Sequence, residues 1–409
     1  MIDGNANVLL IYTGGTIGMV ENAATGALEP FNFSHLRSNM PEIQRLNFNV
    51  DSYLFDPPID SSDVSLSIWQ QMARVIEERY DRYDGFVILH GTDTMAYTAS
   101  ALGFMFENLT KPVILTGSQL PIGKLRTDGK ENLITALEIA ADKDAEGRPV
   151  VPELTVYMQN LLMRGNRTTK VNADNFSAFT SPNYPYLAEA GLNIRYNEKF
   201  ILAPDYSRPV QFNYQMNPHV AVLKLFPGIS EEVVAAHLNI PGLRGLVLET
   251  YGSGNSPITP WFIKLLKGAI DRGIIIVNVT QCLYGSVEMH RYENGRQLEK
   301  LGVVSGHDIT TEAALAKLMI LLGTEEASDV SRLMQASLRG EMTVRRQGLA
   351  LIDMDIRLQS SSRSVSSIIT LPTKNSLKIT RLSCVGSFEG ERLSSDTKRK
   401  CSLICERLR

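Results

Sequence analysis

The sequence predicts an α/β protein with a larger N-terminal domain, a smaller C-terminal domain and an atypical tail. Short apolar runs, such as 8–12 and 86–90, alternate along the chain with segments of helical periodicity. Continuously apolar strands that alternate with helices are typical of a mostly parallel sheet with helices on both faces. A polar, proline-containing stretch at 193–219 divides the alternating region, and it therefore predicts an interdomain linker.

The first alternating region, 1–192, is the predicted N-terminal domain. Apolar residues recur at the spacing of one helix face from Ile68 to Ile76, which predicts a helix over 67–80. The other elements follow from apolar runs and from the Gly, Thr and Asp residues that end them. We expect strands at 8–12, 86–90, 113–116 and 154–158, and further helices at 95–106 and 128–141.

The same alternation resumes after the linker and predicts a C-terminal domain over 220–343. We expect strands at 220–226, 245–248 and 274–279, and helices at 230–238, 260–271 and 311–322. Residues 344–409 differ, with 13 Lys and Arg against 6 Asp and Glu, 12 Ser and three of the four Cys. Because such a segment buries too little apolar surface to offset its ordering entropy, we expect a disordered extension; a basic interaction tail is the alternative.

The composition excludes several classes of protein. The 409 residues hold 41 basic and 44 acidic side chains, so no strong positive field points to nucleic acid or to an anionic membrane. Four Cys are too few for a disulfide scaffold. No apolar run approaches the roughly 18 residues of a membrane helix, and the first residues lack a basic signal-peptide region. We therefore expect a cytoplasmic protein.

Reactive side chains follow three of the predicted strands and one other turn. The glycines of 13–18 match neither a dinucleotide-binding nor a P-loop pattern, but they leave Thr16 beside free backbone N–H groups that are able to hold an oxyanion. The alternative is a turn whose Thr caps a helix. In the turn 91–94, Thr92 and Asp93 offer a hydroxyl and a carboxylate for a substrate ammonium, whereas Thr94 is a helix cap.

Two further segments offer candidates with simpler alternatives. Lys170 follows the fourth strand; it is either a solvated surface lysine or, buried beside Thr and Asp, a group that takes a proton from a hydroxyl. The turn 60–63 is either a helix-capping segment or a pair of hydroxyls for a ligand carboxylate. We read His90 as a buried structural histidine and Cys282 as an inert thiol. Neither G-x-S-x-G nor H-E-x-x-H is present.

Taken in order, these segments resemble the L-asparaginases, most closely the bacterial cytoplasmic type I branch. The resemblance spans about 7–343, and the matching stretches are 12–19, 60–63, 84–102, 116–119 and 164–174. It implies hydrolysis of L-asparagine to L-aspartate and ammonia without a metal or organic cofactor. It also implies that Thr16 is the nucleophile that forms an acyl-enzyme.

The resemblance implies roles for the remaining candidates as well. Thr92, Asp93 and Lys170 correspond to a hydroxyl, carboxylate and amine that activate the nucleophile or water, and Asp93 also holds the substrate ammonium. The substrate carboxylate is bound by the segment that contains Ser61, Ser62 and Asp63. Asn255 resembles a residue that reaches a neighbouring subunit's site, which implies a homodimer or homotetramer.

The chain departs from the family pattern at three places. Ala27 stands where many members carry a lid tyrosine. Thr280, Gln281 and Cys282 match an allosteric asparagine site, but Glu249 stands where that site has Arg and would repel the effector carboxylate. The tail after residue 343 has no counterpart. Glutaminase, an ammonia-supplying amidotransferase subunit and a non-catalytic amino-acid-binding protein remain the alternatives, because one methylene in a pocket changes the binding energy by only about 1–3 kcal/mol.

Overall fold

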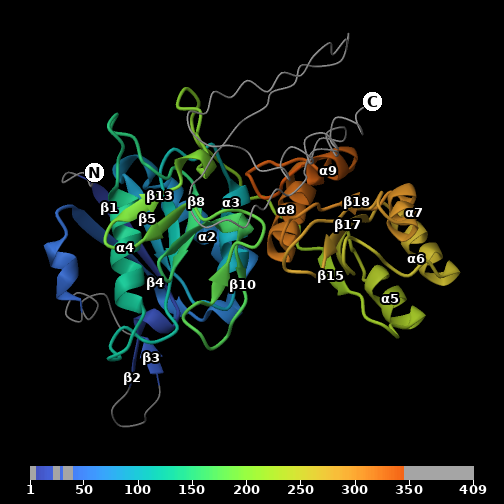
Figure 1. Ribbon diagram of the computed structural model, residues 1–409, viewed down its shortest axis with the longest axis horizontal. Coiled ribbons are helices and arrows are strands. Elements are labelled where there is room, and N and C mark those ends of the chain that lie inside the picture. The colour runs from blue at the N-terminus through green and yellow to red at the C-terminus, as the bar shows by residue number, and fades with distance from the viewer. Residues whose placement is uncertain (1–5, 22–27, 31–39, 345–409) are drawn as a thin grey trace, which may run out of the picture. The chain divides into compact units, whose positions relative to one another are not determined.

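The computed structural model describes residues 6–21, 28–30 and 40–344 (Figure 1). It confirms the predicted class, a two-domain α/β fold with a large, mostly parallel N-terminal sheet and a smaller parallel C-terminal sheet. The predicted tail beyond Val344 lies outside the described residues, and so does Ala27 of the lid. Among the described residues, no helix combines the length and apolar character that a membrane crossing requires.

The large sheet has eight strands in the order β13-β12-β9-β8-β7-β5-β1-β4. Its parallel part consists of β4, β1, β5, β7 and β8, whereas β9, β12 and β13 run antiparallel to their neighbours. The strands are β1 (Asn7–Gly14), β4 (Asn49–Ile59), β5 (Gly85–Leu89), β7 (Val113–Thr116), β8 (Leu154–Met158), β9 (Leu161–Arg164), β12 (Ala188–Ala190) and β13 (Ile194–Tyr196).

Helices cover both faces of this sheet because alternate residues of its strands are apolar on each side. Leu9 and Ile11 of β1 share a core with α2 (Leu66–Glu77) and α3 (Met95–Met105). Val8 and Leu10 of the same strand share the opposite core with α4 (Gly129–Ala141). The strand is therefore buried on both faces, as its continuous apolar run predicts.

The C-terminal sheet has the order β15-β16-β17-β18 and is parallel throughout. Its apolar residues contact α8 and α9 on one face and α5, α6 and α7 on the other (Figure 1). The elements are β15 (Val220–Lys224), α5 (Glu231–Leu238), β16 (Gly245–Thr250), α6 (Pro260–Asp271), β17 (Ile275–Thr280), α7 (Glu293–Leu301), β18 (Val304–Ser305), α8 (Thr311–Thr324) and α9 (Ala327–Met334).

Short elements complete the fold. The 3-10 helices are η1 (Thr16–Gly18), η2 (Pro41–Arg45), η3 (Ser61–Asp63), η4 (Tyr80–Arg82), η5 (Gly165–Arg167) and η6 (Glu198–Phe200). The two-stranded pairs are β2 (Met19–Glu21) with β3 (Leu28–Pro30), β10 (Thr169–Lys170) with β11 (Phe179–Thr180), and β6 (Phe106–Glu107) with β14 (Gln211–Phe212). Within the predicted linker 193–219, β13 pairs with β12, so the large sheet reaches into that segment.

Candidate active site

Four neighbouring strands of the large sheet end at one place, and glycines let their ends approach closely. A Cβ built on Gly14 would lie 2.1 Å from the Ile59 carbonyl oxygen, and one built on Gly15 would lie 2.5 Å from the Gly91 Cα. A Cβ on Gly117 would lie 2.4 Å from the His90 carbonyl oxygen. The ends of β4, β1, β5 and β7 therefore pack backbone against backbone, at the edge where parallel sheets bind ligands.

Thr16 follows Gly15 directly and is the first residue of η1. The turn is supported from below by Tyr12, whose hydroxyl donates a 3.2 Å hydrogen bond to the Gly18 carbonyl. A Cβ on Gly18 would lie 2.2 Å from that hydroxyl, so the ring fills the space under the turn. Burial raises the pKa of Tyr12 to about 12, and this phenol therefore stays a neutral donor at physiological pH.

Thr92, Asp93 and Lys170 meet in one cluster, as the sequence predicts. Lys170 Nζ donates to Thr92 Oγ1 at 2.8 Å and to Asp93 Oδ1 at 2.7 Å. The Lys170 side chain is 18% exposed, so the alternative that Lys170 is a solvated surface lysine is wrong. The Asp93 side chain is 71% exposed and presents its carboxylate to solvent.

Gln119 is a contact of this cluster that was not among the predicted site residues. Thr92 Oγ1 donates to Gln119 Oε1 at 3.0 Å, and Gln119 Nε2 donates to the Asn175 carbonyl at 3.1 Å. Gln119 follows the end of β7, the strand next to β5 in the sheet. A glycine at a strand end precedes Gln119 by two residues, and such a glycine also precedes Thr16 and Thr92.

The turn 60–63 both caps η3 and borders the site. Asp60 accepts hydrogen bonds from the backbone N–H and the hydroxyl of Ser62, and these bonds lower its pKa. Ser61 is buried beside the strand ends, since a Cβ on Gly91 would lie 2.5 Å from its Oγ. Ser62 and Asp63 are exposed.

The expectation that the Thr94 side chain caps α3 is wrong. Thr94 occupies the N-cap position, but its side chain makes no capping hydrogen bond. Its Oγ1 donates instead to the Ser61 carbonyl at 2.7 Å, which ties the turn 91–94 to the turn 60–63. A tertiary acceptor has replaced the local one, because β4 and β5 both end beside β1.

His90 is a buried structural histidine with both ring nitrogens hydrogen-bonded, as predicted. The ring is buried, with Nδ1 2.7 Å from the Gly91 carbonyl and Nε2 3.0 Å from Thr98 Oγ1. A carbonyl only accepts, so Nδ1 carries the proton and Nε2 accepts from the Thr98 hydroxyl. Burial lowers the pKa of His90 to about 4, which keeps the ring neutral.

The candidate effector residues Glu249, Thr280, Gln281 and Cys282 line one cavity of about 250 Å³. Glu249 Oε1 accepts from Thr311 Oγ1 at 2.7 Å, and Glu249 Oε2 lies 3.6 Å from Lys224 Nζ. Glu312 lines the same cavity, and burial raises the pKa of its carboxyl. Thr169, which precedes Lys170, donates to Glu312 Oε1 at 2.6 Å and also lines the cavity, so the cavity borders the strand that carries the lysine.

Asn255 lies in the C-terminal domain, in the turn after β16. Its backbone pairs with Tyr251 in both directions, at 2.9 and 2.8 Å. Asn278 steadies the turn by donating to the Gly254 carbonyl at 3.1 Å. Among the described contacts none connects Asn255 with Thr16 or Thr92, so within one chain the structure does not bring it to the cluster. Among the described residues no group of three or more His, Cys, Asp or Glu side chains is arranged to hold a metal ion.

Fold and site together define a two-domain α/β protein with hydroxyl, amine and carboxylate groups at the carboxyl ends of parallel strands. Family models match both domains: "Asparaginase, N-terminal" over 7–202 and "Glutaminase/Asparaginase C-terminal domain" over 219–334. The chain therefore belongs to the asparaginase family.

Individual relatives agree with this assignment. The chain is 43% identical to L-asparaginase 1 of Escherichia coli K12, over 82% of this chain and 98% of that one. It is 42% identical to the 60 kDa lysophospholipase of Mus musculus, over 82% of this chain and 62% of that one. Among solved structures, L-asparaginase I of Vibrio cholerae is 44% identical and matches with a TM-score of 0.75, over 83% of this chain and 99% of that one.

Proposed function

We propose that this protein is an asparaginase that hydrolyses L-asparagine to L-aspartate and ammonia through a threonine acyl-enzyme. The observation that carries the proposal is the cluster of Lys170, Thr92 and Asp93, with Nζ at 2.8 and 2.7 Å from its two partners. The contact of Gly15 with Gly91 supports a single pocket for Thr16 and Thr92. The family match supports the choice of an amide substrate.

In the proposed mechanism, Thr16 Oγ1 attacks the side-chain amide carbon of asparagine. The tetrahedral intermediate collapses with cleavage of the C–N bond, and the nitrogen leaves as ammonia after it gains a proton. Water then attacks the aspartyl ester, its O–H proton returns to the threonine oxygen, and aspartate leaves. Because a threonine hydroxyl is a weak nucleophile at neutral pH, each step needs a base.

We infer that Lys170 and Thr92 supply that base for one of the two steps. A neutral Lys170 amine accepts the Thr92 proton at the observed 2.8 Å, and the hydroxyl then takes a proton from the attacking group. The O–H of Thr92 points to Gln119 in the resting arrangement and must turn toward Nζ. Asp93, at 2.7 Å from Nζ, stabilises the ammonium that forms.

Substrate recognition is assigned to the rim of the cluster. The exposed carboxylate of Asp93 suits the α-ammonium of an amino acid, and the hydroxyls of Ser61 and Ser62 suit its α-carboxylate. Asp63 is the last residue of the turn that holds these two serines and adds a carboxylate to it. We propose that Asn255 completes the site from the neighbouring subunit of a homodimer or homotetramer, and that the protein acts in the cytoplasm.

For the cavity around Glu249 we propose that asparagine does not bind there as an effector. Glu249 is held by Thr311 and Lys224 inside the cavity, so its carboxylate meets any incoming carboxylate with a like charge. We also propose the domain limits 1–192 and 220–343, with 193–219 as linker and 344–409 as tail. The family match to 219–334 supports the C-terminal domain, whereas the match to 7–202 and the pairing of β13 in the large sheet favour an N-terminal domain that extends to about residue 202.

Ammonia release by the purified full-length protein tests the proposal. We expect release from asparagine, and loss of at least about 10²-fold in kcat for Thr16→Ala, because the acyl-enzyme no longer forms. Glutamine in place of asparagine measures the preference against the glutaminase alternative. Equal ammonia release by wild type and Thr16→Ala would refute the mechanism, and binding of asparagine without release would indicate an amino-acid-binding protein.

A further inference from the structure

The strand that carries Lys170 is short and is held from outside the large sheet. β10 has two residues, and among the strands that the structure describes it pairs only with β11, which also has two. The turn before it, η5, is closed locally by Thr168, whose Oγ1 donates to the Arg164 carbonyl at 2.7 Å. A two-residue strand supplies little restraint by itself, so the position of Lys170 depends on the bond from Thr169 to Glu312 and on what η5 is attached to.

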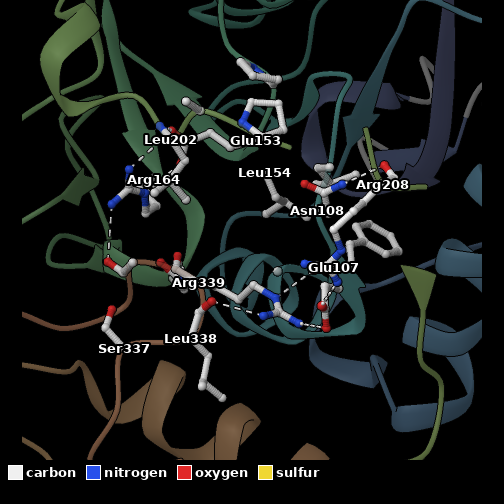
Figure 2. A pocket seen from close by; sticks show the side chains of 18 residues that line it. Glu107, Asn108, Glu153, Leu154, Arg164, Leu202, Arg208, Ser337, Leu338 and Arg339 are labelled. Atoms are coloured by element: carbon white, nitrogen blue, oxygen red, sulfur yellow. Dashed lines mark hydrogen bonds and ion pairs between the residues drawn. The ribbon is translucent and has the colours of Figure 1, made fainter. Parts of the chain in front are cut away.

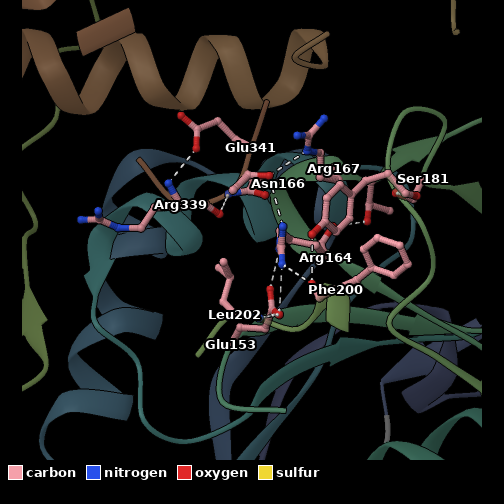
Figure 3. A network of polar contacts seen from close by, with 12 residues as sticks. Glu153, Arg164, Asn166, Arg167, Ser181, Phe200, Leu202, Arg339 and Glu341 are labelled. Atoms are coloured by element: carbon pink, nitrogen blue, oxygen red, sulfur yellow. Dashed lines mark hydrogen bonds and ion pairs between the residues drawn. The ribbon is translucent and has the colours of Figure 1, made fainter. Parts of the chain in front are cut away.

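The side chains of η5 and of the residue before it are attached to the segment 337–343, which follows the last helix. Asn166 Nδ2 donates to the Arg339 carbonyl at 3.0 Å, and Arg167 Nε donates to the Gly340 carbonyl at 2.7 Å (Figure 3). Arg164 Nη1 reaches the same Gly340 carbonyl at 3.3 Å. The segment therefore offers backbone acceptors to three side chains within six residues of Lys170.

A closed ring of contacts fastens the end of this segment. Arg167 Nη2 donates to Thr343 Oγ1 at 3.2 Å, and Arg167 Nη1 lies 3.0 Å from Asp308 Oδ2. The Thr343 backbone N–H donates to Asp308 Oδ1 at 2.6 Å. The guanidinium and the carboxylate are 3% and 10% exposed, so the pair is shielded from water and its geometry is well defined.

A buried ion pair holds the segment to α8. Lys317 Nζ lies 2.7 Å from Glu341 Oε1, and both side chains are 0% exposed. Glu341 also accepts from the backbone N–H groups of Leu338 and Arg339, while Lys317 donates to the carbonyl of Ala336. Buried ion pairs add little net stability, but their directional bonds specify one arrangement of the chain. This pair thus fixes the register of the segment.

One side of the segment lies beside open space, whereas Met342 is buried in the core and Leu338 packs against it, so polar contacts and packing together hold the segment. Residues 337–340 line a cavity of about 480 Å³ (Figure 2). Arg339 bridges the edge of this cavity by donating to the Phe106 carbonyl at 3.0 Å and to Glu107 Oε2 at 3.1 Å. The cavity leaves room for residues 337–340 to shift when an anchor is lost.

We propose that the segment 337–343 is the positioning element of Lys170. It holds η5 through Arg164, Asn166 and Arg167, and η5 in turn keeps Nζ on Thr92. The inference rests on the proposed function, because it requires Lys170 to act in catalysis. It predicts that residues with no contact to substrate, above all Gly340 and Arg167, control kcat.

Gly340 allows the sharpest test. Its φ is +71°, and a Cβ built on it would lie 2.5 Å from Arg164 Nη1. Because the Arg164 guanidinium is buried and held by Glu153 at 2.6 Å, we expect Gly340→Ala to displace the segment from Arg164 without touching the cluster. Since a misplacement of about 1 Å costs up to about 10²-fold in rate, we expect kcat for asparagine to fall by about 10- to 100-fold with KM changed less than about threefold, because the substrate contacts stay in place.

A second set of variants removes the anchors, and thermal unfolding is measured beside kcat because Arg167→Met leaves the nearly buried Asp308 carboxylate without its cation. Arg167→Met deletes both bonds to the segment, and we expect the same loss in kcat; Arg167→Lys, which keeps a donor, recovers part of it. The double variant Lys317→Met with Glu341→Leu replaces the buried ion pair with apolar side chains of similar volume, and we expect the same loss in kcat. Arg332→Ala, which breaks the exposed pair with Asp329 on α9, is the matched control and keeps wild-type kinetics.

A double-mutant cycle separates the possible outcomes. Gly340→Ala is measured in the wild-type and Lys170→Ala backgrounds, with thermal unfolding of each variant as the folding control. If the segment acts through the lysine, the effect of Gly340→Ala on kcat disappears in the Lys170→Ala background. An equal loss in both backgrounds, or wild-type kcat in Gly340→Ala and Arg167→Met, overturns the inference. Full activity of Lys170→Ala overturns the proposed function instead.

Discussion

Gly15 and Gly91 touch backbone to backbone: a Cβ on Gly15 would lie 2.5 Å from both the Cα and the backbone nitrogen of Gly91. Each glycine precedes a threonine, so this contact brings the turn with Thr16 against the turn with Thr92. The strands concerned, β1 and β5, are adjacent and parallel. The closeness of two proposed catalytic residues 76 positions apart thus depends on the absence of a side chain at Gly15, whereas a Cβ on Gly91 would meet Ser61 Oγ at 2.5 Å.

Gly15→Ala should therefore cost more stability than a glycine variant with the same backbone strain. Gly15 has φ +86° and Gly228 has φ +89°, but a Cβ on Gly228 meets nothing within 4 Å. Both substitutions pay about 1–2 kcal/mol for the left-handed conformation, and Gly15→Ala adds about 1–3 kcal/mol of overpacking. Urea unfolding measures the difference, and equal losses for the two variants would contradict the close contact.

Lys170→Met should separate activity from stability. We expect kcat for asparagine to fall by at least about 10²-fold, because the proton acceptor is gone. Since Asp93 is mostly exposed, the free energy of unfolding should change by less than about 1 kcal/mol. Ammonia release and urea unfolding give the two values, with Lys267→Met, from an exposed pair on α6, as the control. A kcat within threefold of wild type would remove Lys170 from the mechanism.

His90 predicts an acid-dependent loss of stability. Its pKa is lowered to about 4 in the folded protein from an ordinary 6.5, so between these values the unfolded chain binds the extra proton. Stability is complete above pH 6.5 and falls as the pH drops toward 4, by about 2 kcal/mol between pH 6.5 and pH 5.

The comparison with His90→Gln isolates this contribution from that of the carboxylates. We expect the free energy of unfolding of wild type to fall more steeply between pH 6.5 and 5 than that of the variant, measured by urea unfolding at each pH. Parallel curves would show that the His90 ring is free to protonate in the folded protein.

The position of Glu249 leads to a prediction of how the reaction rate depends on asparagine concentration. Because its carboxylate is held in the cavity by Thr311 and Lys224, we expect a hyperbolic dependence of rate on asparagine, with a Hill coefficient near 1. Initial rates over a wide concentration range test this. A clearly sigmoidal curve would show that the cavity takes the effector in spite of Glu249.

Truncation distinguishes the tail from the segment before it. The described contacts of the segment 337–343 end at Thr343, so a chain that stops at Val344 should keep the wild-type melting temperature and kcat. A chain that stops at Ala336 loses the contacts of η5 and should lose most of its activity. Loss of folding in the chain that stops at Val344 would show that the tail belongs to the C-terminal domain.

Sequence patterns located the regular elements well where apolar residues formed a continuous run or recurred at the spacing of a helix. The predicted helix at 260–271 and the predicted strands at 113–116 and 154–158 match α6, β7 and β8 residue for residue. β4 escaped prediction, because it is an edge strand whose residues are mostly half-buried or exposed and lack an apolar run. The helices α7 and α9 were not predicted either, because their apolar faces are narrow.

The sequence alone determined which reactive side chains are present and which strand end each of them follows, because hydrophobic runs and glycines mark where strands stop. Only the tertiary structure decided which ends are neighbours, and hence that Gln119 contacts Thr92 and that Ser61 lies beside Gly91. It alone brought Gly340 to Arg164 and Arg167, some 170 residues away in the chain. Contacts of that range depend on strand order and chain packing, and these leave no periodic signal in a single sequence.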